Sequence, residues 1–197
     1  TPVFFLSDGY MANGSEPWSF PKGEDLKPII PKMVDTKKGG SYLPYERDEN
    51  LVRDWALPGT SGFEHRIGGL EKEENTGNVS YDPENHQKMV KIREEKIQKI
   101  ADSIPAQPIN NGVEEGEVLV LSWGSTYGVV KTAVKHCLNE NVKVGHAHLR
   151  YLNPFPKNLG EIIKQFNRVI VPEMNNGQLV KIIRDQFLID AQGLNKI

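Results

Sequence analysis

Glycine and hydroxyl residues follow a short apolar run near the middle of the chain. Residues 118–121 are all aliphatic, and Gly124, Ser125 and Thr126 come shortly after them. A Gly-Ser-Thr turn between a buried strand and a helix offers free backbone N–H groups and two hydroxyls, which is the chemistry that holds a phosphate or carboxylate. The glycine spacing matches neither a dinucleotide-binding fingerprint nor a Walker loop. Because Ser125 or Thr126 also suits the N-cap of the following helix, capping is favoured and anion binding is the alternative.

Charged and amide side chains follow the next two apolar runs. Arg150 comes after residues 142–149, and Glu173 comes after residues 168–171, with Asn175 in the same loop. One interpretation is recognition of a ligand or partner by these side chains. The other is an ion pair between Arg150 and Glu173, which is favoured because charges at such positions are usually paired. The candidate ligand- or partner-binding residues are therefore Gly124, Ser125, Thr126, Arg150, Glu173 and Asn175.

Histidine and cysteine give little support for a metal site or a nucleophile. His146 and His148 are two residues apart on an expected strand and so face the same way, but that strand carries no third ligand. We interpret them as hydrogen-bonded structural histidines. Cys137 is the single cysteine, which excludes an internal disulfide and a cysteine-ligated metal centre built from this chain alone. No Ser-His-Asp order appears, and we expect no catalytic residue and no metal site in this chain.

The elements that position these residues alternate between apolar runs and helical stripes. This order, β-α-β-α-β-α, predicts an α/β fold with an open parallel sheet and right-handed crossovers. The carboxyl ends of parallel strands meet at one edge, so the loops that carry the candidate residues should lie together. The expected strands are 118–121, 142–149 and 168–171, and the expected helices are 125–139, 158–166 and 177–188.

The part of the chain that precedes these elements has a different composition and little periodicity. Residues 1–81 are rich in Gly and Pro, with turn sequences at 21–25, 37–41 and 58–62. A long weakly periodic stretch that carries aromatic residues is more typical of a segment lying on a neighbour's surface than of disorder. The aromatic residues are Trp18, Tyr42, Tyr45, Trp55 and Phe63.

Two further elements are expected in this part of the chain. The apolar run at residues 3–6 predicts a buried strand, which would have to pair with something outside this chain. Residues 82–104 predict an amphipathic helix, with Asp82 as its N-cap and Pro83 in its first position.

Composition narrows the class of protein. Of the 197 residues, 38% are hydrophobic and 25% are charged, with a formal net charge of −2. This near-zero charge gives no electrostatic footprint for nucleic acid or an acidic membrane surface. No apolar run approaches the ~18 residues that span a bilayer. A globular cytoplasmic protein with no nucleic-acid or membrane partner is expected.

Several longer stretches of the sequence allow a more specific assignment than their physical chemistry alone does. They are SDGYMANGSEPW (7–18), GFEHRIGGLEKEENTGNVSYDPENHQKMVKIREEKIQKIA (62–101), LSWGSTYG (121–128), HAHLRYLNPFPKNLGEI (146–162) and VPEMNNGQLVKIIR (171–184). In this order the sequence resembles the C-terminal part of alpha subunits of 2-oxoglutarate:ferredoxin oxidoreductases, in the 2-oxoacid:acceptor oxidoreductase family. The resemblance covers essentially the whole chain.

The resemblance implies an activity and a set of cofactors. Such enzymes convert 2-oxoglutarate, CoA and oxidised ferredoxin to succinyl-CoA, CO2 and reduced ferredoxin, using thiamine diphosphate, Mg, CoA and iron–sulfur chemistry. None of these is expected to be bound by this chain alone, because the implied beta subunit holds the diphosphate and magnesium. The catalytic carboxylate would lie upstream of Thr1. This part is therefore expected to serve structure and assembly, with the beta subunit, ferredoxin through the complex and a further copy of the chain as possible partners.

The resemblance also implies a division into domains. Residues 1–30 would be the tail of a thiamine pyrimidine-binding domain, 31–112 a connecting arm that includes the helix 82–104, and 113–197 a transketolase C-terminal-like domain. An alternative function stays open from the residues alone. It is a stand-alone anion- or nucleotide-binding α/β module that uses the turn at Gly124, Ser125 and Thr126.

Overall fold

The computed structural model describes residues 1–36 and 41–196, in two compact units. The first unit comprises residues 1–16 together with the chain from residue 101 onward, and the second comprises Pro17–Ile100. The turn expected at 37–41 lies largely outside the described residues. These units divide the chain at other positions than the expected domain limits of 30 and 112, and the assignment of those domains stays a prediction.

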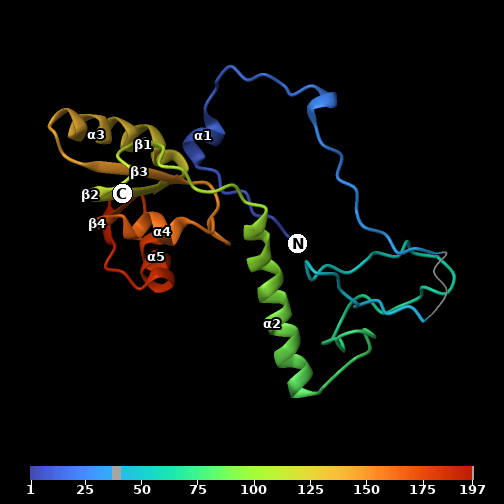
Figure 1. The fold of residues 1–197 in the computed structure, drawn as a ribbon. Coiled ribbons are helices and arrows are strands. Elements are labelled where there is room, and N and C mark those ends of the chain that lie inside the picture. Colours follow the sequence, from blue (N-terminus) through green and yellow to red (C-terminus); the bar gives the residue numbers. More distant parts are fainter. Residues whose placement is uncertain (37–40, 197) are drawn as a thin grey trace. The chain divides into compact units, whose positions relative to one another are not determined.

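A five-stranded sheet forms the centre of the first unit (Figure 1). Its spatial order is β1-β3-β2-β4-β5. The pairs β2–β3, β2–β4 and β4–β5 are parallel, which confirms the expected α/β fold, whereas β1 pairs antiparallel with β3. The strands are β1 (Asn111–Gly112), β2 (Gly116–Trp123), β3 (Val144–Leu149), β4 (Phe166–Glu173) and β5 (Gln192–Asn195).

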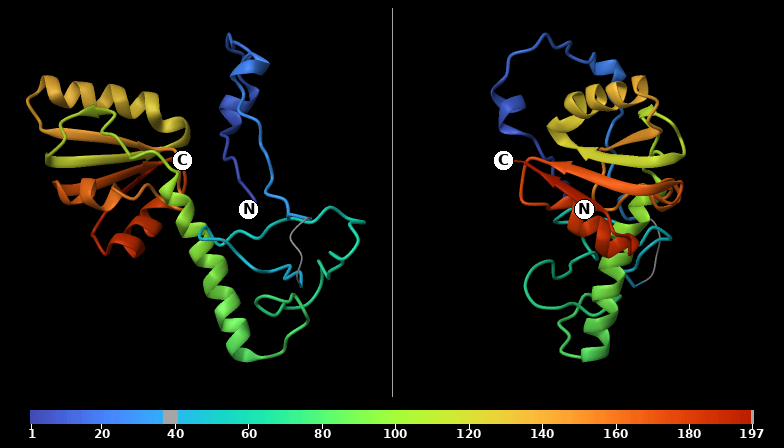
Figure 2. Two further views of the ribbon diagram at one scale, coloured as in Figure 1. Left: turned by 45° about the vertical axis from the view of Figure 1, so that its right-hand side comes forward. Right: turned by 90° about the vertical axis from the view of Figure 1, so that its left-hand side faces the viewer.

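Helices cover both faces of this sheet. Figure 2 shows α3 on one face and α4 with α5 on the other. Each helix follows a strand, as the alternating pattern predicts. The helices are α3 (Tyr127–Asn139), which follows a 3-10 turn η3 (Gly124–Thr126), α4 (Leu159–Lys164) and α5 (Leu179–Phe187). The short helix α1 (Gly9–Asn13) also belongs to the first unit.

The alternation of side chains along β2 divides the core into two layers. Leu119 and Leu121 are fully buried and belong to the larger cluster, with residues of α4 and α5 such as Ile183. Val118 and Val120 point the other way and pack in a smaller cluster with Val130 and Val134 of α3. Successive strand residues face opposite sides of a sheet, so one apolar strand supports both helical layers. This packing fixes the ends of β2 and β4, where the candidate residues lie.

The second unit contains one long helix, α2 (Pro83–Lys99), a 3-10 turn η1 (Gly23–Asp25) and otherwise irregular chain. The carboxylate of Asp82 accepts a hydrogen bond from the backbone N–H of Glu84, so the expected N-cap is confirmed. The helix ends at Lys99 and a 3-10 turn, η2 (Ile100–Asp102), follows it. A ring contact between Tyr42 and Phe63, 5.0 Å apart, joins parts of the irregular chain.

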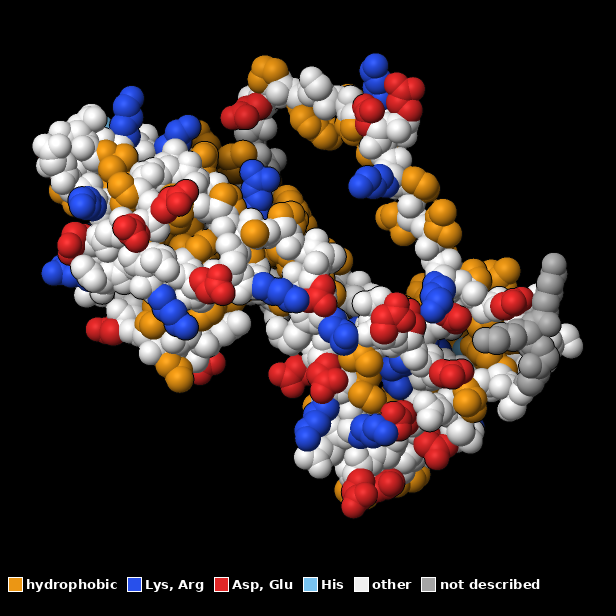
Figure 3. All heavy atoms as spheres, in the orientation of Figure 1, with side chains coloured by type: hydrophobic (Ala, Val, Ile, Leu, Met, Phe, Trp, Pro, Cys, Tyr) orange, Lys and Arg blue, Asp and Glu red, His pale blue; other side chains and the backbone are white. Residues whose placement is uncertain are grey.

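The buried strand expected at residues 3–6 stays a prediction, because it was expected to pair with something outside this chain. These residues have no regular secondary structure, and their side chains are between 62% and 91% exposed. An apolar run predicts burial, but burial needs a surface to pack on, and the described chain does not supply one here. Apolar side chains are likewise exposed along residues 17–33 (Figure 3). The exposed large side chains in that stretch are Trp18, Phe20, Leu26, Ile29, Ile30 and Met33.

A carboxylate ties the irregular chain of the second unit to α2. Glu71 Oε2 lies 2.6 Å from His86 Nδ1, and Glu71 Oε1 accepts a hydrogen bond of 3.1 Å from Arg93 Nη1. Hydrogen bonds from Arg93, and then from His86, lower the pKa of Glu71 from 4.5 to about 2. The stabilisation is therefore complete above pH 4.5 and is lost as the pH falls toward 2.

Substituting Glu71→Gln is expected to destabilise the second unit by about 1 kcal/mol, since both basic partners are more than half exposed and solvent screens the interaction. Hydrogen exchange of the amides between residues 71 and 80, measured at pH 7, should become several-fold faster. Glu95→Gln, a substitution at an exposed position of α2, is the control. Exchange in Glu71→Gln as slow as in the unmodified chain would contradict the role of this ion pair.

Candidate functional site

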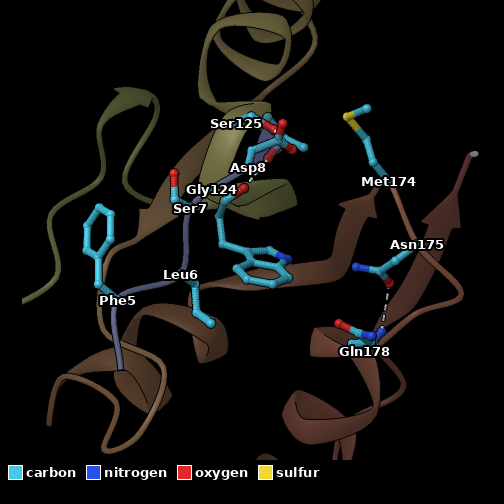
Figure 4. A pocket seen from close by; sticks show the side chains of 11 residues that line it. Phe5, Leu6, Ser7, Asp8, Gly124, Ser125, Met174, Asn175 and Gln178 are labelled. Atoms are coloured by element: carbon cyan, nitrogen blue, oxygen red, sulfur yellow. Dashed lines mark hydrogen bonds between the residues drawn. The ribbon is translucent and has the colours of Figure 1, made fainter. Parts of the chain in front are cut away.

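A pocket of about 450 Å³ lies at the carboxyl edge of the sheet in the first unit. The end of β2, the turn η3, the loop after β4 and residues 5–8 together line it. In Figure 4, Phe5 and Leu6 lie on one side, Met174, Asn175 and Gln178 on the other, and Asp8 beside Ser125. The lining residues are Phe5, Leu6, Ser7, Asp8, Trp123, Gly124, Ser125, Thr126, Met174, Asn175 and Gln178.

Asp8 reaches the Gly-Ser-Thr turn from the other end of the chain. Ser125 Oγ donates a hydrogen bond of 2.9 Å to Asp8 Oδ2, and the backbone N–H of Tyr10 donates one of 2.8 Å to Asp8 Oδ1. These bonds, that from Tyr10 first, lower the pKa of Asp8 below its usual value of 3.8. The carboxylate is therefore ionised at neutral pH. The Ser125 hydroxyl, which the sequence suggested as a donor to an external anion, therefore donates its hydrogen bond to a carboxylate of the chain itself.

The capping role favoured for Ser125 or Thr126 is confirmed only in position, because Thr126 is the N-cap residue of α3 but its side chain does not cap the helix. The hydroxyl of Thr126 donates to the carbonyl oxygen of Trp123 at 2.7 Å, and Thr126 makes no side-chain capping bond to α3. Gly124 takes a φ of +60°, a conformation that favours glycine. Because the chain enters α3 through the turn η3, the hydroxyls point to other partners than the first N–H groups of that helix.

Glu173 organises the start of α5. Its side chain is only 3% exposed, and it accepts hydrogen bonds from the backbone N–H groups of Leu179 and Val180 at 2.8 and 3.1 Å. The indole of Trp123 and the amide of Asn175 donate to Glu173 Oε1 at 3.3 and 3.2 Å. The carboxylate thus satisfies two free N–H groups of a helix N-terminus. It does not line the pocket but holds two residues that do.

The ion pair favoured between Arg150 and Glu173 is therefore wrong. The described chain places no arginine or lysine within ion-pair distance of Glu173, and Arg150 is exposed. The register pairs Trp123 with Leu149, so Arg150 begins a loop at the same edge as the pocket, as the topology predicts. Its side chain is nevertheless not part of the lining. The carboxylate of Glu173 instead takes its partners from the helix that follows it.

Asn175 shapes the loop between β4 and α5. Its Oδ1 accepts hydrogen bonds from the backbone N–H groups of Gly177 at 2.8 Å and Gln178 at 3.0 Å. Four of the six candidate residues, Gly124, Ser125, Thr126 and Asn175, therefore meet at one pocket. Asp8 and Trp123 were missed as site residues. The Ser-Asp-Gly sequence at residues 7–9 is an N-cap signal, but it contains no sign of the contact with Ser125.

The histidine pair forms a buried polar cluster under α3. Ser122 Oγ lies 2.6 Å from His146 Nε2 and 2.8 Å from His148 Nδ1, and Asn111 Nδ2 lies 3.2 Å from His146 Nδ1. His146 is fully buried, which lowers its pKa from 6.5 to about 4, and burial also lowers the pKa of His148. The interpretation as structural, hydrogen-bonded histidines is confirmed. Within residues 1–36 and 41–196, no group of three or more His, Cys, Asp or Glu side chains could hold a metal ion.

The charge of the pocket decides what it can bind. Of the described residues that line it, none is Lys, Arg or His, and Asp8 is ionised. A phosphate or diphosphate would meet one negative charge and no cation, so the lining does not fit the diphosphate of a thiamine cofactor. The alternative function as an anion-binding module finds no support in this arrangement and stays a prediction.

The comparisons with known proteins agree on one group of enzymes. Residues 116–192 match the model of the pyruvate:ferredoxin oxidoreductase core domain II. The chain is 46% identical over 198 residues to the 2-oxoglutarate oxidoreductase subunit KorA of Mycobacterium tuberculosis, covering all of this chain and 30% of that protein. It is 28% identical to the 2-oxoglutarate synthase subunit KorA of Methanothermobacter marburgensis, covering 90% of this chain and 46% of that one.

A solved structure is also similar. It is the 2-oxoglutarate:ferredoxin oxidoreductase of Magnetococcus marinus with 2-oxoglutarate, coenzyme A and succinyl-CoA bound. The match has a TM-score of 0.79 at 33% sequence identity and covers 89% of this chain and 31% of that chain. The chain thus spans less than half the length of each of these relatives.

Proposed function

The chain belongs to the 2-oxoacid:ferredoxin oxidoreductase family by homology over its whole length, and from this premise we propose that it is part of the alpha subunit of a 2-oxoglutarate:ferredoxin oxidoreductase. The whole enzyme would convert 2-oxoglutarate, CoA and oxidised ferredoxin to succinyl-CoA, CO2 and reduced ferredoxin. The observation that carries the proposal is the 46% identity to a 2-oxoglutarate oxidoreductase subunit across all of this chain.

The role of this part within the enzyme is proposed to be structural. Its first unit is a packed α/β domain, and residues 3–6 and 17–33 expose large apolar side chains. Exposed apolar surface of this extent is typical of a surface that another part of an assembly covers. We propose that these segments contact the rest of the subunit and its partners. Those partners would be a beta subunit, ferredoxin through the complex, and a further copy of the chain.

The cofactors of the whole enzyme would be thiamine diphosphate, Mg, CoA and an iron–sulfur cluster. Thiamine diphosphate supplies the electron sink for decarboxylation of a 2-oxoacid when it is bound. The described residues offer no metal-binding cluster, and the pocket has no cationic lining for a diphosphate. We propose that other parts of the enzyme hold these groups. Within residues 1–36 and 41–196, no helix is long and apolar enough to cross a membrane. We propose the cytoplasm as the location.

The proposed function predicts a sharp difference between the assembled enzyme and the isolated chain. The complete alpha subunit, purified with its beta subunit, should reduce ferredoxin only when 2-oxoglutarate and CoA are both present. The 197-residue chain alone should give no turnover, since we propose that the catalytic groups lie elsewhere in the enzyme. Reduction of ferredoxin is followed by its absorbance, with pyruvate as the control substrate. Turnover by the isolated chain, or faster turnover of the complex with pyruvate, would contradict the proposal.

A further inference from the structure

The pocket at the carboxyl edge of the sheet carries an unbalanced negative charge. Asp8 is the one ionisable side chain in the part of the lining that the structure describes. Its hydrogen-bond donors, the Tyr10 N–H and the Ser125 hydroxyl, are both neutral. They orient the carboxylate without neutralising it. A half-buried carboxylate that faces a cavity favours a positively charged occupant over a neutral one.

The bonding of Asp8 also indicates the shape of that occupant. Each carboxylate oxygen accepts one hydrogen bond from the chain, and an ionised carboxylate has capacity for about four. One acceptor position on each oxygen therefore remains for a ligand. A guanidinium group has two parallel N–H donors in a fixed fork, which matches two oxygens of one carboxylate. An ammonium group presents no such planar fork.

The walls of the pocket suit a planar cation. Trp123 lines it, together with the apolar residues Phe5, Leu6 and Met174. Guanidinium groups are weakly hydrated and stack on aromatic faces, so they lose less on entering such a cavity than an ammonium does. We propose that this pocket binds the guanidinium group of an arginine, with Asp8 as the counter-ion.

The arginine that the topology places at this edge of the sheet does not fill this role. Arg150 begins the loop after β3 at the same edge of the sheet, but it is exposed and lies outside the lining. The other ionisable group beside the pocket, Glu173, is buried and bonded to the start of α5, and it adds a further negative charge nearby. The pocket therefore takes its cation from outside the described chain, either as free arginine or as an arginine side chain of another polypeptide.

Calorimetric titration of the purified chain tests the proposal without depending on oxidoreductase activity. Arginine amide should bind. Citrulline amide keeps the α-amino group but has a neutral urea group in place of the guanidinium, and it should bind at least about tenfold more weakly, because its side chain has no charge to pair with Asp8. Lysine amide tests whether the fork matters and should bind more weakly than arginine amide. An acetylated Gly-Arg-Gly amide distinguishes the source. Tighter binding of this peptide assigns the pocket to a polypeptide, and tighter binding of arginine amide assigns it to the free molecule.

Variants locate the binding at Asp8. Asp8→Asn retains an acceptor for Tyr10 and a partner for Ser125 but removes the charge, and it should weaken arginine amide binding about tenfold or more. Ser125→Ala removes a neutral donor that orients the carboxylate, and it should weaken binding by less than Asp8→Asn does. Asp25→Asn, which removes the same charge outside the pocket, should leave binding unchanged. Circular dichroism confirms that each variant is folded. Equal binding by folded Asp8→Asn, equal binding of citrulline amide, or no binding of arginine amide to the unmodified chain would overturn the proposal.

Discussion

Replacing Glu173 with alanine is expected to lower the free energy of unfolding of the first unit by about 3 kcal/mol. The carboxylate is 3% exposed and accepts four hydrogen bonds, two of them from the first N–H groups of α5. Alanine leaves the N–H groups of Leu179 and Val180 buried without an acceptor, and it removes the link between Trp123 and Asn175. Buried groups that lose their partner incur the full cost of desolvation, so the loss should exceed that of one ordinary hydrogen bond.

Urea unfolding, followed by hydrogen exchange of amides in β2 and β4, measures this loss in the first unit alone. Glu173→Gln keeps one oxygen as an acceptor and should be destabilised by less than Glu173→Ala. Glu161→Ala, at an exposed site in α4, should change the free energy of unfolding by no more than about 0.5 kcal/mol. A loss below about 1 kcal/mol in Glu173→Ala would mean that water replaces the carboxylate at the start of α5.

The regular elements of the first unit were predictable because their burial is periodic. The aliphatic run around Leu119 and Leu121, and the helical stripe that includes Val130 and Val134, each give a local signal of which face is buried. The strands β1 (Asn111–Gly112) and β5 (Gln192–Asn195) have no such signal. They are two and four residues long, rich in Asn and Gly, and they exist because an edge of the sheet is available to pair with them.

The candidate site was only partly predictable, because its partners are set by tertiary structure. The turn at Gly124 and the loop at Asn175 follow strands, and parallel topology alone brings them together. The bond from Ser125 to Asp8 joins residues 117 positions apart, and no local pattern encodes it. The sequence also shows that Glu173 is a charge near a helix start, but not whether it serves that helix or Arg150. Glu173 is only 3% exposed in the structure, which shows that its carboxylate serves the helix and not Arg150.

Acidification from pH 7.5 to pH 4 is expected to destabilise the first unit, with His146 contributing up to about 3 kcal/mol. Burial lowers the pKa of this residue from 6.5 to about 4. The unfolded chain therefore binds the proton first as the pH falls. The stabilisation from the neutral imidazole is complete above pH 6.5 and is lost progressively down to about pH 4.

The surroundings of His146 explain why it stays neutral in the fold. Ser122 of β2, Asn111 of β1 and the ring of Tyr127 in α3, 5.6 Å away, surround it, and none carries a negative charge. The ionisable neighbour His148 lies on the same strand and opposes a charge on His146. Arg150, which is positive, opposes a charge on His148 in turn. Asn111 Nδ2 can donate only to an unprotonated Nδ1, so protonation also ends that bond between β1 and β3.

The variant His146→Gln isolates this contribution. Glutamine stays neutral throughout the pH range, so the free energy of unfolding of the variant should fall less between pH 7.5 and pH 4 than that of the unmodified chain. The remaining pH dependence includes His148, whose pKa is lowered in the same direction. His136→Gln, at an exposed position of α3, should retain the full pH dependence. If His146→Gln and the unmodified chain lose stability in parallel, the neutral imidazole is not the source, because a group that titrates alike in the folded and unfolded states contributes no pH dependence to stability.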